Sequence, residues 1–167
     1  MFRSVTLPQN IPGRLYLHSM PGCYEQWADF IAEAKQRGIH IIVCLTPNDE
    51  IEKKSPSYAK AIRDGTLNCQ RECFPIPDYE VPQDQEAYAA FLTCIAELLR
   101  SGKTVLVHCG AGIGRTGTFA LCLLLAMGVN RMEAEKAIHD AGSYPETDEQ
   151  RRQVDWCEKK FLSLLSG

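Results

Sequence analysis

The sequence lacks a long apolar run and an N-terminal targeting pattern. Its most apolar stretch, residues 119–127, is much shorter than the roughly 18 apolar residues that a membrane-spanning helix requires. The N-terminus has no basic flank followed by an apolar segment, the pattern that marks a signal peptide. We therefore expect a cytoplasmic protein that does not interact with membranes.

The sequence also lacks an excess of positive charge. Its 18 lysines and arginines are outnumbered by 21 aspartates and glutamates, which gives a formal net charge of −3 at pH 7. This balance disfavours binding to nucleic acid or to anionic lipid, because both need a basic surface. Any anion that this protein binds must be held by a local site.

Eight cysteines are present, but none of them form the Cys-x-x-Cys pairs of zinc or redox sites. The nearest two, Cys69 and Cys73, would share one face of a strand about 13 Å apart, which is too far for a disulfide bond. His18, His40 and His139 are isolated in the sequence. We therefore expect reduced thiols, no bound metal and no organic cofactor.

No internal repeat, linker or charge run divides the 167 residues. A chain of this length is about one domain and buries roughly 70% of the surface that it exposes when unfolded. Hydrophobic residues make up 45% of the chain and charged residues 23%, which excludes a disordered or low-complexity protein. We predict a single domain over residues 1–167 and expect it to act as a monomer.

Apolar runs with strand character alternate with helical patterns along the chain. Several helical patterns end at a glycine, as at Gly38, and one begins at a capping residue, Asp84. Strands are predicted at residues 14–18, 39–45, 67–76 and 103–108, and helices at about 27–37, 55–64, 84–101, 116–127, 131–140 and 147–165. The pattern over 116–127 is apolar all round, which is typical of a helix buried at the centre of a domain.

Strands that alternate with helices predict an α/β fold with a mainly parallel central sheet and helices on both faces. In such folds ligands bind at the carboxyl ends of the strands. The loop that follows the strand over 103–108 is therefore the first candidate for a functional site.

That loop lies within residues 107–117, V-H-C-G-A-G-I-G-R-T-G, and leads directly into the apolar helix. Its three glycines allow the backbone to take positive φ and to turn tightly, so that successive N–H groups point inward and bind an anion. The planar guanidinium of Arg115 can hold two oxygens of one phosphoryl group, which a lysine cannot do. The same positive environment activates a thiol, so Cys109 is predicted as the nucleophile. The predicted substrate-binding residues are Gly110, Ala111, Gly112, Ile113, Gly114 and Arg115.

Three other interpretations compete for the same loop. Residues 112–117 have the glycine spacing of a dinucleotide-binding loop, but the chain stays helical where that fold needs a strand with an acidic end. Residues 109–116 nearly match the phosphate loop of NTPases, but Cys109 replaces its first glycine, Arg115 replaces its lysine, and no strand-end aspartate follows for Mg²⁺. A plain glycine-rich turn would not explain why histidine, cysteine, arginine and threonine occur together.

Residues 108–117 are similar to the motif H-C-x-x-G-x-x-R-[ST]-G of the cysteine-dependent protein-tyrosine and dual-specificity phosphatases, at every fixed position. The segment P-I-P-D over residues 75–78 resembles the mobile loop that carries the general acid of these enzymes. Together with residues 15–23 and 38–51, it resembles the kinase-associated phosphatase branch of the dual-specificity group. The large tyrosine-specific enzymes share A-G-I-G-R-[ST]-G-T-F, but their phosphotyrosine-recognition loop has no counterpart in this sequence.

The resemblance implies that Cys109 attacks phosphorus while Arg115 and the loop amides hold the phosphoryl oxygens. Asp78 would protonate the leaving oxygen, because an alkoxide or phenolate departs poorly without a proton; the alternative is an aspartate that merely forms a turn. His108 would orient the loop and tune the thiol without acting as a base. Thr116 would either donate its hydroxyl to the sulfur of Cys109 or simply begin the helix.

Other residues have competing interpretations that the sequence leaves open. Glu80 and Asp84 are rival acids, although Asp84 is better explained as the cap of the following helix. Gln150 could position the hydrolytic water, but the T-x-x-Q spacing around it also matches a capping box, which we favour. Cys44 could form a disulfide with Cys109, but a cysteine buried in the core is the preferred interpretation.

We therefore predict a phosphatase that hydrolyses phosphotyrosine, and also phosphoserine and phosphothreonine, through a phosphocysteine intermediate. Its substrate would be a phosphoprotein or phosphopeptide, and a short chain with few insertions indicates a shallow pocket. Two alternatives stay open: a phosphatase of inositol phosphates or RNA 5′-phosphates, and a non-catalytic phosphate-binding module. The lipid 3-phosphatases resemble this sequence at residues 150–152, but they usually carry lysines where Gly110 and Ile113 stand.

Overall fold

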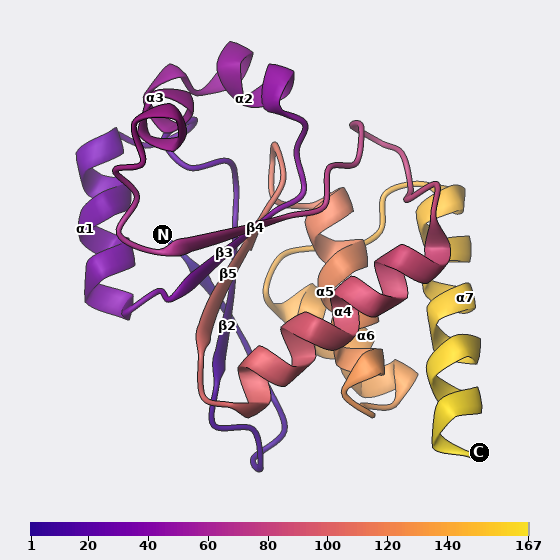
Figure 1. Ribbon diagram of the computed structural model, residues 1–167. Helices are drawn as coiled ribbons and strands as arrows, with labels where there is room; N and C mark the ends of the chain where they lie inside the picture. Colours follow the sequence, from indigo (N-terminus) through magenta and orange to yellow (C-terminus); the bar gives the residue numbers. More distant parts are fainter. Residues whose placement is uncertain (167) are drawn as a thin grey trace.

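The computed structural model describes residues 1–166, which contain one five-stranded sheet. Its strands are β1 (Arg3–Val5), β2 (Arg14–His18), β3 (Ile41–Cys44), β4 (Gln70–Cys73) and β5 (Thr104–His108), in the spatial order β1-β2-β5-β3-β4. Strands β2, β5, β3 and β4 are parallel, and β1 pairs antiparallel with β2 (Figure 1). The four parallel strands therefore end at one edge of the sheet.

Within residues 1–166, seven helices cover the two faces of the sheet (Figure 1). They are α1 (Trp27–Arg37), α2 (Asn48–Lys54), α3 (Pro56–Asp64), α4 (Gln85–Arg100), α5 (Gly114–Ala126), α6 (Arg131–Asp140) and α7 (Asp148–Leu165). Helices α1, α2 and α3 lie on one side of the sheet, and α4 to α7 lie on the other. The predicted α/β fold, with a mainly parallel sheet between two helical layers, is confirmed.

Alternating side chains of the strands build separate cores on the two faces. On β3, Ile41 and Val43 pack with α4 to α7, whereas Ile42 and Cys44 pack with α1 and α3. All four side chains are at most 2% exposed. A sheet that is buried on both faces explains why β3 and β5 appear in the sequence as continuous apolar runs instead of alternating patterns.

Helix α5 begins directly after the glycine-rich loop and runs through the middle of its helical layer. Every residue from 114 to 125 is buried, as the all-round apolar pattern predicts. The helix packs against α4, α6 and α7. A Cβ atom added at Gly117 would collide with the backbone nitrogen of Tyr144. This glycine therefore lets the first turn of α5 pack against the connection between α6 and α7.

Two short elements, β1 and α2, lie outside the sequence predictions. Strand β1 has only three residues, with Arg3 in register with Leu17 of β2, and is too short to show an alternating pattern. Helix α2 begins after Pro47, and Ile51 is its one buried residue among seven, so it shows no apolar stripe. The strand predicted over 67–76 is shorter in the structure, because the prolines that follow β4 cannot donate to a strand ladder.

The part of the chain that the structure describes holds no group of three or more His, Cys, Asp and Glu side chains placed to bind a metal ion. Over the same residues, no helix is both long enough and apolar enough to cross a membrane. All eight cysteines are free thiols.

Candidate active site

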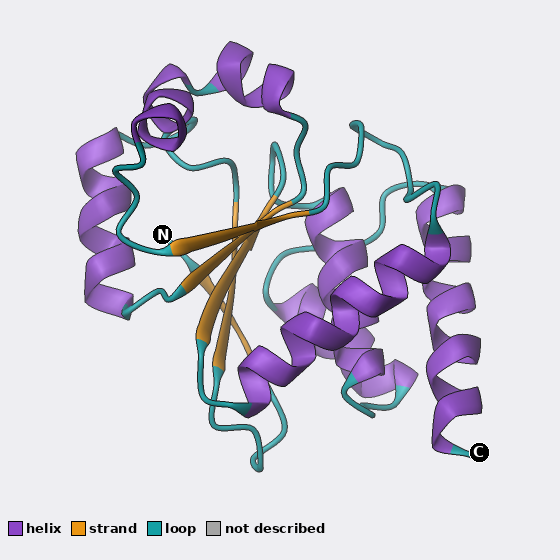
Figure 2. Cartoon of the chain, in the orientation of Figure 1, coloured by secondary structure: helices purple, strands orange, loops and turns teal. Residues whose placement is uncertain are grey.

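The glycine-rich loop lies at the carboxyl edge of the sheet, between β5 and α5. The loops after β2, β3 and β4 meet it there, together with the connection between α6 and α7 (Figure 2). Cys109 and Arg115, each 3% exposed, lie at the base of this region. Asp78 comes from the loop after β4, and its Oδ1 lies 3.1 Å from Nη2 of Arg115. The structure thus brings together side chains that are distant in the sequence.

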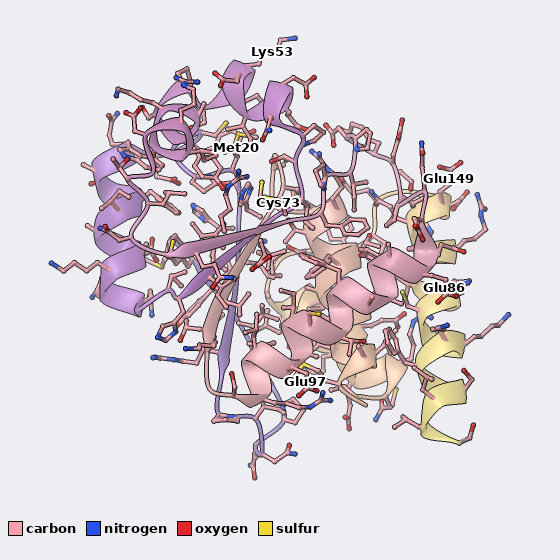
Figure 3. The ribbon with its side chains drawn as sticks, in the orientation of Figure 1. Met20, Lys53, Cys73, Glu86, Glu97 and Glu149 are labelled. Atoms are coloured by element: carbon pink, nitrogen blue, oxygen red, sulfur yellow. The ribbon has the colours of Figure 1, made fainter. Side chains whose placement is uncertain are left out.

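The first carbonyl groups of the loop have hydrogen-bond partners on its outside. The oxygen of Cys109 lies 3.0 Å from Nδ1 of His108. The oxygen of Gly110 accepts a hydrogen bond of 2.8 Å from the backbone N–H of Met20, which follows β2 (Figure 3). Because C=O and N–H point in opposite directions in a trans peptide, the N–H groups of Gly110 and Ala111 point to the inside. Inward N–H groups are the arrangement that an anion-binding nest requires.

The carbonyl of Gly112 is held by two side chains. Arg3 Nη2 donates to this oxygen at 2.6 Å, and Ser143 Oγ donates to it at 2.7 Å. By the same antiparallel geometry, the N–H of Ile113 points to the inside of the loop. The N–H of Gly112 itself donates to Sγ of Cys109 at 3.3 Å. The sulfur of Cys109, the predicted nucleophile, therefore accepts a hydrogen bond from the backbone of the loop.

Only one of the three loop glycines adopts positive φ. Gly112 has φ 77°, and a Cβ atom there would collide with a backbone carbonyl of the β2 end. The expectation that Gly110 and Gly114 also use this freedom is wrong. These two glycines provide space instead: an added Cβ atom would meet the carboxylate of Glu50 at Gly110 and that of Glu146 at Gly114.

His108 is held through both ring nitrogens, and it is fully buried. Its Nε2 lies 2.9 Å from the hydroxyl of Tyr58. A neutral imidazole that donates from Nδ1 to the Cys109 carbonyl must accept at Nε2, so Tyr58 is the donor. Burial raises the pKa of Tyr58 well above its usual value, which keeps this hydroxyl protonated. These two contacts fit the supporting role expected for His108. They also make Tyr58 a second supporting residue, which no sequence motif indicates.

Most of the five N–H groups of Arg115 are already occupied. Nη1 donates to Glu50 Oε2 and to the carbonyl of Ile76, each at 2.9 Å, and Nη2 donates to Glu50 Oε1 at 2.9 Å. The second N–H of Nη2 faces Asp78. Nε is buried and has no partner among residues 1–166. Nε–H is therefore the donor left for a ligand, and Nη2 supplies another when Asp78 moves.

Glu50 is a site residue that the sequence analysis missed. It belongs to α2, its side chain is 13% exposed, and Lys54 donates to its Oε1 at 3.0 Å. Burial by itself would raise the pKa of Glu50, but hydrogen bonds from Arg115 and Lys54 outweigh burial and lower the pKa. Burial would lower the pKa of Arg115, whereas its contacts with Glu50 raise the pKa. In the sequence, Glu50 and Lys54 look like an ordinary surface pair of one helix.

Asp78 lies where the loop after β4 passes from an anchored to an exposed segment. The preceding Ile76 donates its N–H to the carbonyl of Leu45 at 3.0 Å, and its own carbonyl is held by Arg115. The side chain of Asp78 is 48% exposed and accepts a hydrogen bond from the N–H of Tyr79 at 3.0 Å. Tyr79 has φ 63°, a conformation that is rare outside glycine and that is concentrated at functional loops.

The remaining candidates have clear local contacts. Asp84 caps α4 by accepting from the N–H of Ala87, and Gln150 forms a capping box with Thr147, as favoured from the sequence. The amide Nε2 of Gln150 is nevertheless buried without a partner in the described residues. The hydroxyl of Thr116 is also buried without a partner there.

Cys44 is fully buried, which agrees with the preferred interpretation of a core cysteine. Its sulfur contacts the carbonyl and hydroxyl oxygens of Thr46 at 3.6 and 3.4 Å. It packs with the core under α3, whereas Cys109 packs with the core on the opposite face.

Residues 9–159 match the family described as Swiss Army Knife protein, DSP-PTPase phosphatase domain. The chain belongs to this family. The expected relationship to the protein-tyrosine and dual-specificity phosphatases is therefore confirmed.

Relatives of this phosphatase domain are found in viruses and animals. The chain is 31% identical over 157 residues to the putative tyrosine phosphatase 067L of Invertebrate iridescent virus 3, covering 87% of this chain and 61% of that protein. It is 41% identical over 63 residues to receptor-type tyrosine-protein phosphatase V of Rattus norvegicus, covering 36% of this chain and 4% of that protein. The chain thus spans a small part of the receptor-type protein and about three fifths of the viral one.

The domain is also similar to solved phosphatase structures. One is a crystal structure of kinase associated phosphatase with its catalytic-site cysteine replaced by serine. The two structures superpose with a TM-score of 0.81 and 20% sequence identity, and the match covers 98% of this chain and 96% of that chain. Another is the crystal structure of the human tyrosine phosphatase-like serine/threonine/tyrosine-interacting protein. It superposes with a TM-score of 0.70 and 20% sequence identity, and the match covers 92% of this chain and 96% of that chain. These likenesses establish the shared fold.

The Glu50→Gln substitution is expected to destabilise the protein by about 2 kcal/mol at neutral pH, because it removes the carboxylate that accepts two hydrogen bonds from the buried Arg115. Folding lowers the pKa of Glu50 below its usual value of 4.5. The carboxylate therefore stabilises the fold above that value, and this contribution is lost as the pH falls through the lowered pKa. Urea unfolding at neutral and acidic pH should show the difference between wild type and variant shrinking on acidification.

Glu52→Gln is the matched control, because Glu52 belongs to the same helix but pairs with Arg63 at the exposed surface. This substitution should leave the free energy of unfolding nearly unchanged at every pH. Equal destabilisation by the two substitutions, with the same pH dependence, would contradict the role assigned to Glu50.

Proposed function

We propose that this protein is a cysteine-dependent phosphatase that hydrolyses phosphotyrosine, phosphoserine and phosphothreonine on protein side chains. The observation that carries the proposal is one loop at the carboxyl edge that contains Cys109, with a backbone N–H donated to its sulfur, and the buried Arg115, whose Nε–H has no partner within residues 1–166. Membership of the DSP-PTPase family supports the same activity. The chemistry needs neither a metal ion nor an organic cofactor.

In the first step, the thiolate of Cys109 attacks phosphorus in line with the leaving oxygen. The N–H groups of Gly110, Ala111 and Ile113 hold the equatorial oxygens together with Nε–H of Arg115, which stabilises the charge of the transition state. The incoming phosphoryl group takes over the Nη2 donor that Asp78 contacts. Asp78 is then released to protonate the leaving oxygen as the P–O bond breaks and the S–P bond forms.

In the second step, water attacks the phosphocysteine. Asp78, now ionised, takes a proton from this water, and the S–P bond breaks to return the thiolate of Cys109 and inorganic phosphate. The buried hydroxyl of Thr116 is available to donate to the leaving sulfur, since it has no other partner within residues 1–166. The amide Nε2 of Gln150, which has no partner within residues 1–166, is available to hold the attacking water, in addition to the capping role of that side chain.

The chemistry of the rim favours a phosphoprotein substrate with a single phosphate. Gly110 and Ile113 add no cation to the loop, and Lys54 at the rim is paired with Glu50. Such a rim offers little to the further phosphates of an inositol phosphate or an RNA 5′-triphosphate. The net charge of −3 likewise disfavours nucleic acid and anionic membranes as partners.

A non-catalytic phosphate-binding module is the second candidate. It is favoured by the structural likeness to a human protein named as phosphatase-like. Binding alone, however, would need neither a thiol at the base of the site nor an acid beside Arg115. Steady-state rates on phosphotyrosine and phosphoserine peptides, with inositol phosphates and an RNA 5′-triphosphate as comparisons, separate the two candidates and identify the substrate class.

Cys109→Ser should abolish turnover of p-nitrophenyl phosphate and still bind inorganic phosphate, because the backbone donors and Arg115 do the binding. Cys94→Ser, at an exposed cysteine, is the control and should keep the wild-type rate. Calorimetric titration with phosphate measures the binding. Turnover near the wild-type rate in Cys109→Ser, or a wild-type activity that a metal chelator removes, would overturn the mechanism.

Asp78→Asn should slow the enzyme by about 10²–10⁴-fold on phosphoserine peptides and much less on p-nitrophenyl phosphate, because p-nitrophenolate leaves without a proton. Asp84→Asn is the matched control, since asparagine also caps a helix. Its rates should match the wild type on both substrates. If Asp84→Asn instead shows the dependence on the leaving group and Asp78→Asn does not, the acid has been assigned to the wrong residue.

A further inference from the structure

Arg3 reaches the active-site loop from the far N-terminal end of the chain. Because β1 runs antiparallel to β2, with Arg3 opposite Leu17, the first residue of β1 lies at the carboxyl edge of the parallel strands. Its guanidinium joins the loop to the connection between α6 and α7. Nη2 donates to Gly112 O at 2.6 Å, and Nη1 donates to Ala141 O at 2.9 Å, Gly142 O at 2.9 Å and Ser143 Oγ at 3.0 Å.

The Gly112 carbonyl is the point where this contact affects the chemistry. Its peptide group carries the N–H of Ile113, which must point inward to bind a phosphoryl oxygen. The N–H of Gly112 itself donates to the sulfur of Cys109. The charged guanidinium of Arg3, by donating to the Gly112 carbonyl, therefore fixes the orientation of the peptide between Gly112 and Ile113. It also restricts the backbone rotation that a glycine would otherwise allow at position 112.

The environment of Arg3 agrees with a role at this site. Burial lowers the pKa of Arg3, while the negative charge of an ionised Cys109 would raise it. Arg3 also lies outside the segment 9–159 that matches the phosphatase-domain family. A fragment limited to the family segment would lack this contact.

We propose that Arg3 is a positioning residue of the phosphate site, which holds the Gly112 carbonyl so that the Ile113 N–H faces the substrate. The kinetic consequence rests on the proposed phosphatase function, whereas the effect on anion binding rests on the geometry alone. Ser143 shares the task, because its hydroxyl donates to the same carbonyl.

The test compares Arg3→Gln and Arg3→Lys with Arg14→Gln, a control at an exposed arginine of β2. Arg3→Gln should lower kcat/KM for p-nitrophenyl phosphate about 10-fold and raise the inhibition constant of inorganic phosphate by a similar factor, as expected for loss of a charged hydrogen bond. Arg3→Lys should recover part of both, because lysine keeps the positive charge but has a single donor nitrogen in place of the two that Arg3 uses. Adding Ser143→Ala to Arg3→Gln should increase the loss further.

A second readout separates this inference from the proposed function. In ¹⁵N NMR spectra of Cys109→Ser, phosphate should shift the Ile113 amide strongly, and Arg3→Gln should weaken that response. This measurement needs no turnover, so an inactive wild type would overturn the proposed function and leave the test of Arg3 intact. An unchanged Ile113 response and an unchanged inhibition constant in Arg3→Gln, with only a lower melting temperature, would overturn the inference.

A separate observation concerns two thiols on neighbouring strands. Cys44 of β3 and Cys73 of β4 are register partners in a parallel pair (Figure 3 labels Cys73). Adjacent strands lie about 4.8 Å apart, within the Cα separation that disulfides span, and partners in register face the same side of the sheet.

The surroundings of the pair suit a redox reaction. Cys44 is fully buried, but Cys73 is exposed on the edge strand, so a small oxidant can reach the pair. The neighbouring Cys73 lowers the pKa of Cys44 by more than the burial of Cys44 raises it. A thiolate is the form that reacts with peroxide.

We infer that Cys44 and Cys73 form a peroxide-sensitive pair that closes to a disulfide. The deprotonated sulfur attacks hydrogen peroxide, the O–O bond breaks, and a sulfenic acid and hydroxide form. The second thiol then attacks this sulfur, the S–S bond forms, and the S–O bond breaks as the hydroxyl leaves with the thiol proton as water.

Tryptic peptides distinguish the possible pairings after peroxide treatment. Cys44 lies in peptide 38–53, Cys109 in 104–115, and Cys73 shares peptide 72–100 with Cys94. In Cys94→Ser, mass spectrometry without reductant should find 38–53 linked to 72–100, and the further change Cys73→Ser should remove that link. Cys109→Ser should retain the link, which makes the result independent of phosphatase activity. A link between 38–53 and 104–115 instead, or no link to 38–53, would overturn the inference.

Discussion

A backbone cradle for an anion imposes one constraint on which the rest of the site depends. If successive N–H groups point inward, the carbonyl groups between them point outward, and in a buried loop each carbonyl needs a donor. One donor, His108, directly precedes the loop. The other donors come from three distant parts of the chain: Met20 after β2, Arg3 of β1, and Ser143 between α6 and α7. The loop conformation is therefore a property of the whole carboxyl edge.

The buried charge of Arg115 imposes the second constraint. A guanidinium that is 3% exposed is stable only when its donors are occupied. Glu50 and the Ile76 carbonyl hold one side of the group, and this leaves Nε and the Nη2 donor near Asp78 for the substrate. The same contacts that stabilise the charge therefore set the direction in which the guanidinium presents its remaining donors.

Sheet topology explains why short elements carry important residues. Parallel strands β2, β5, β3 and β4 end at one edge, so each following loop can contribute a side chain. Helix α2 carries Glu50, and the antiparallel direction of β1 places Arg3 at that edge. Neither element builds much of the hydrophobic core, which is why periodicity does not reveal them, yet both hold the polar groups of the site.

The sequence by itself determined the alternation of strands and helices, the buried helix α5 and the motif around Cys109 and Arg115, because periodicity, capping and loop chemistry are local properties. It also indicated the caps at Asp84 and Gln150. Tertiary structure alone decided the partners of the loop, including Glu50 and Arg3. Those contacts join residues far apart in the chain, and an arginine or a glutamate in a short polar segment looks the same whether it faces solvent or a buried charge.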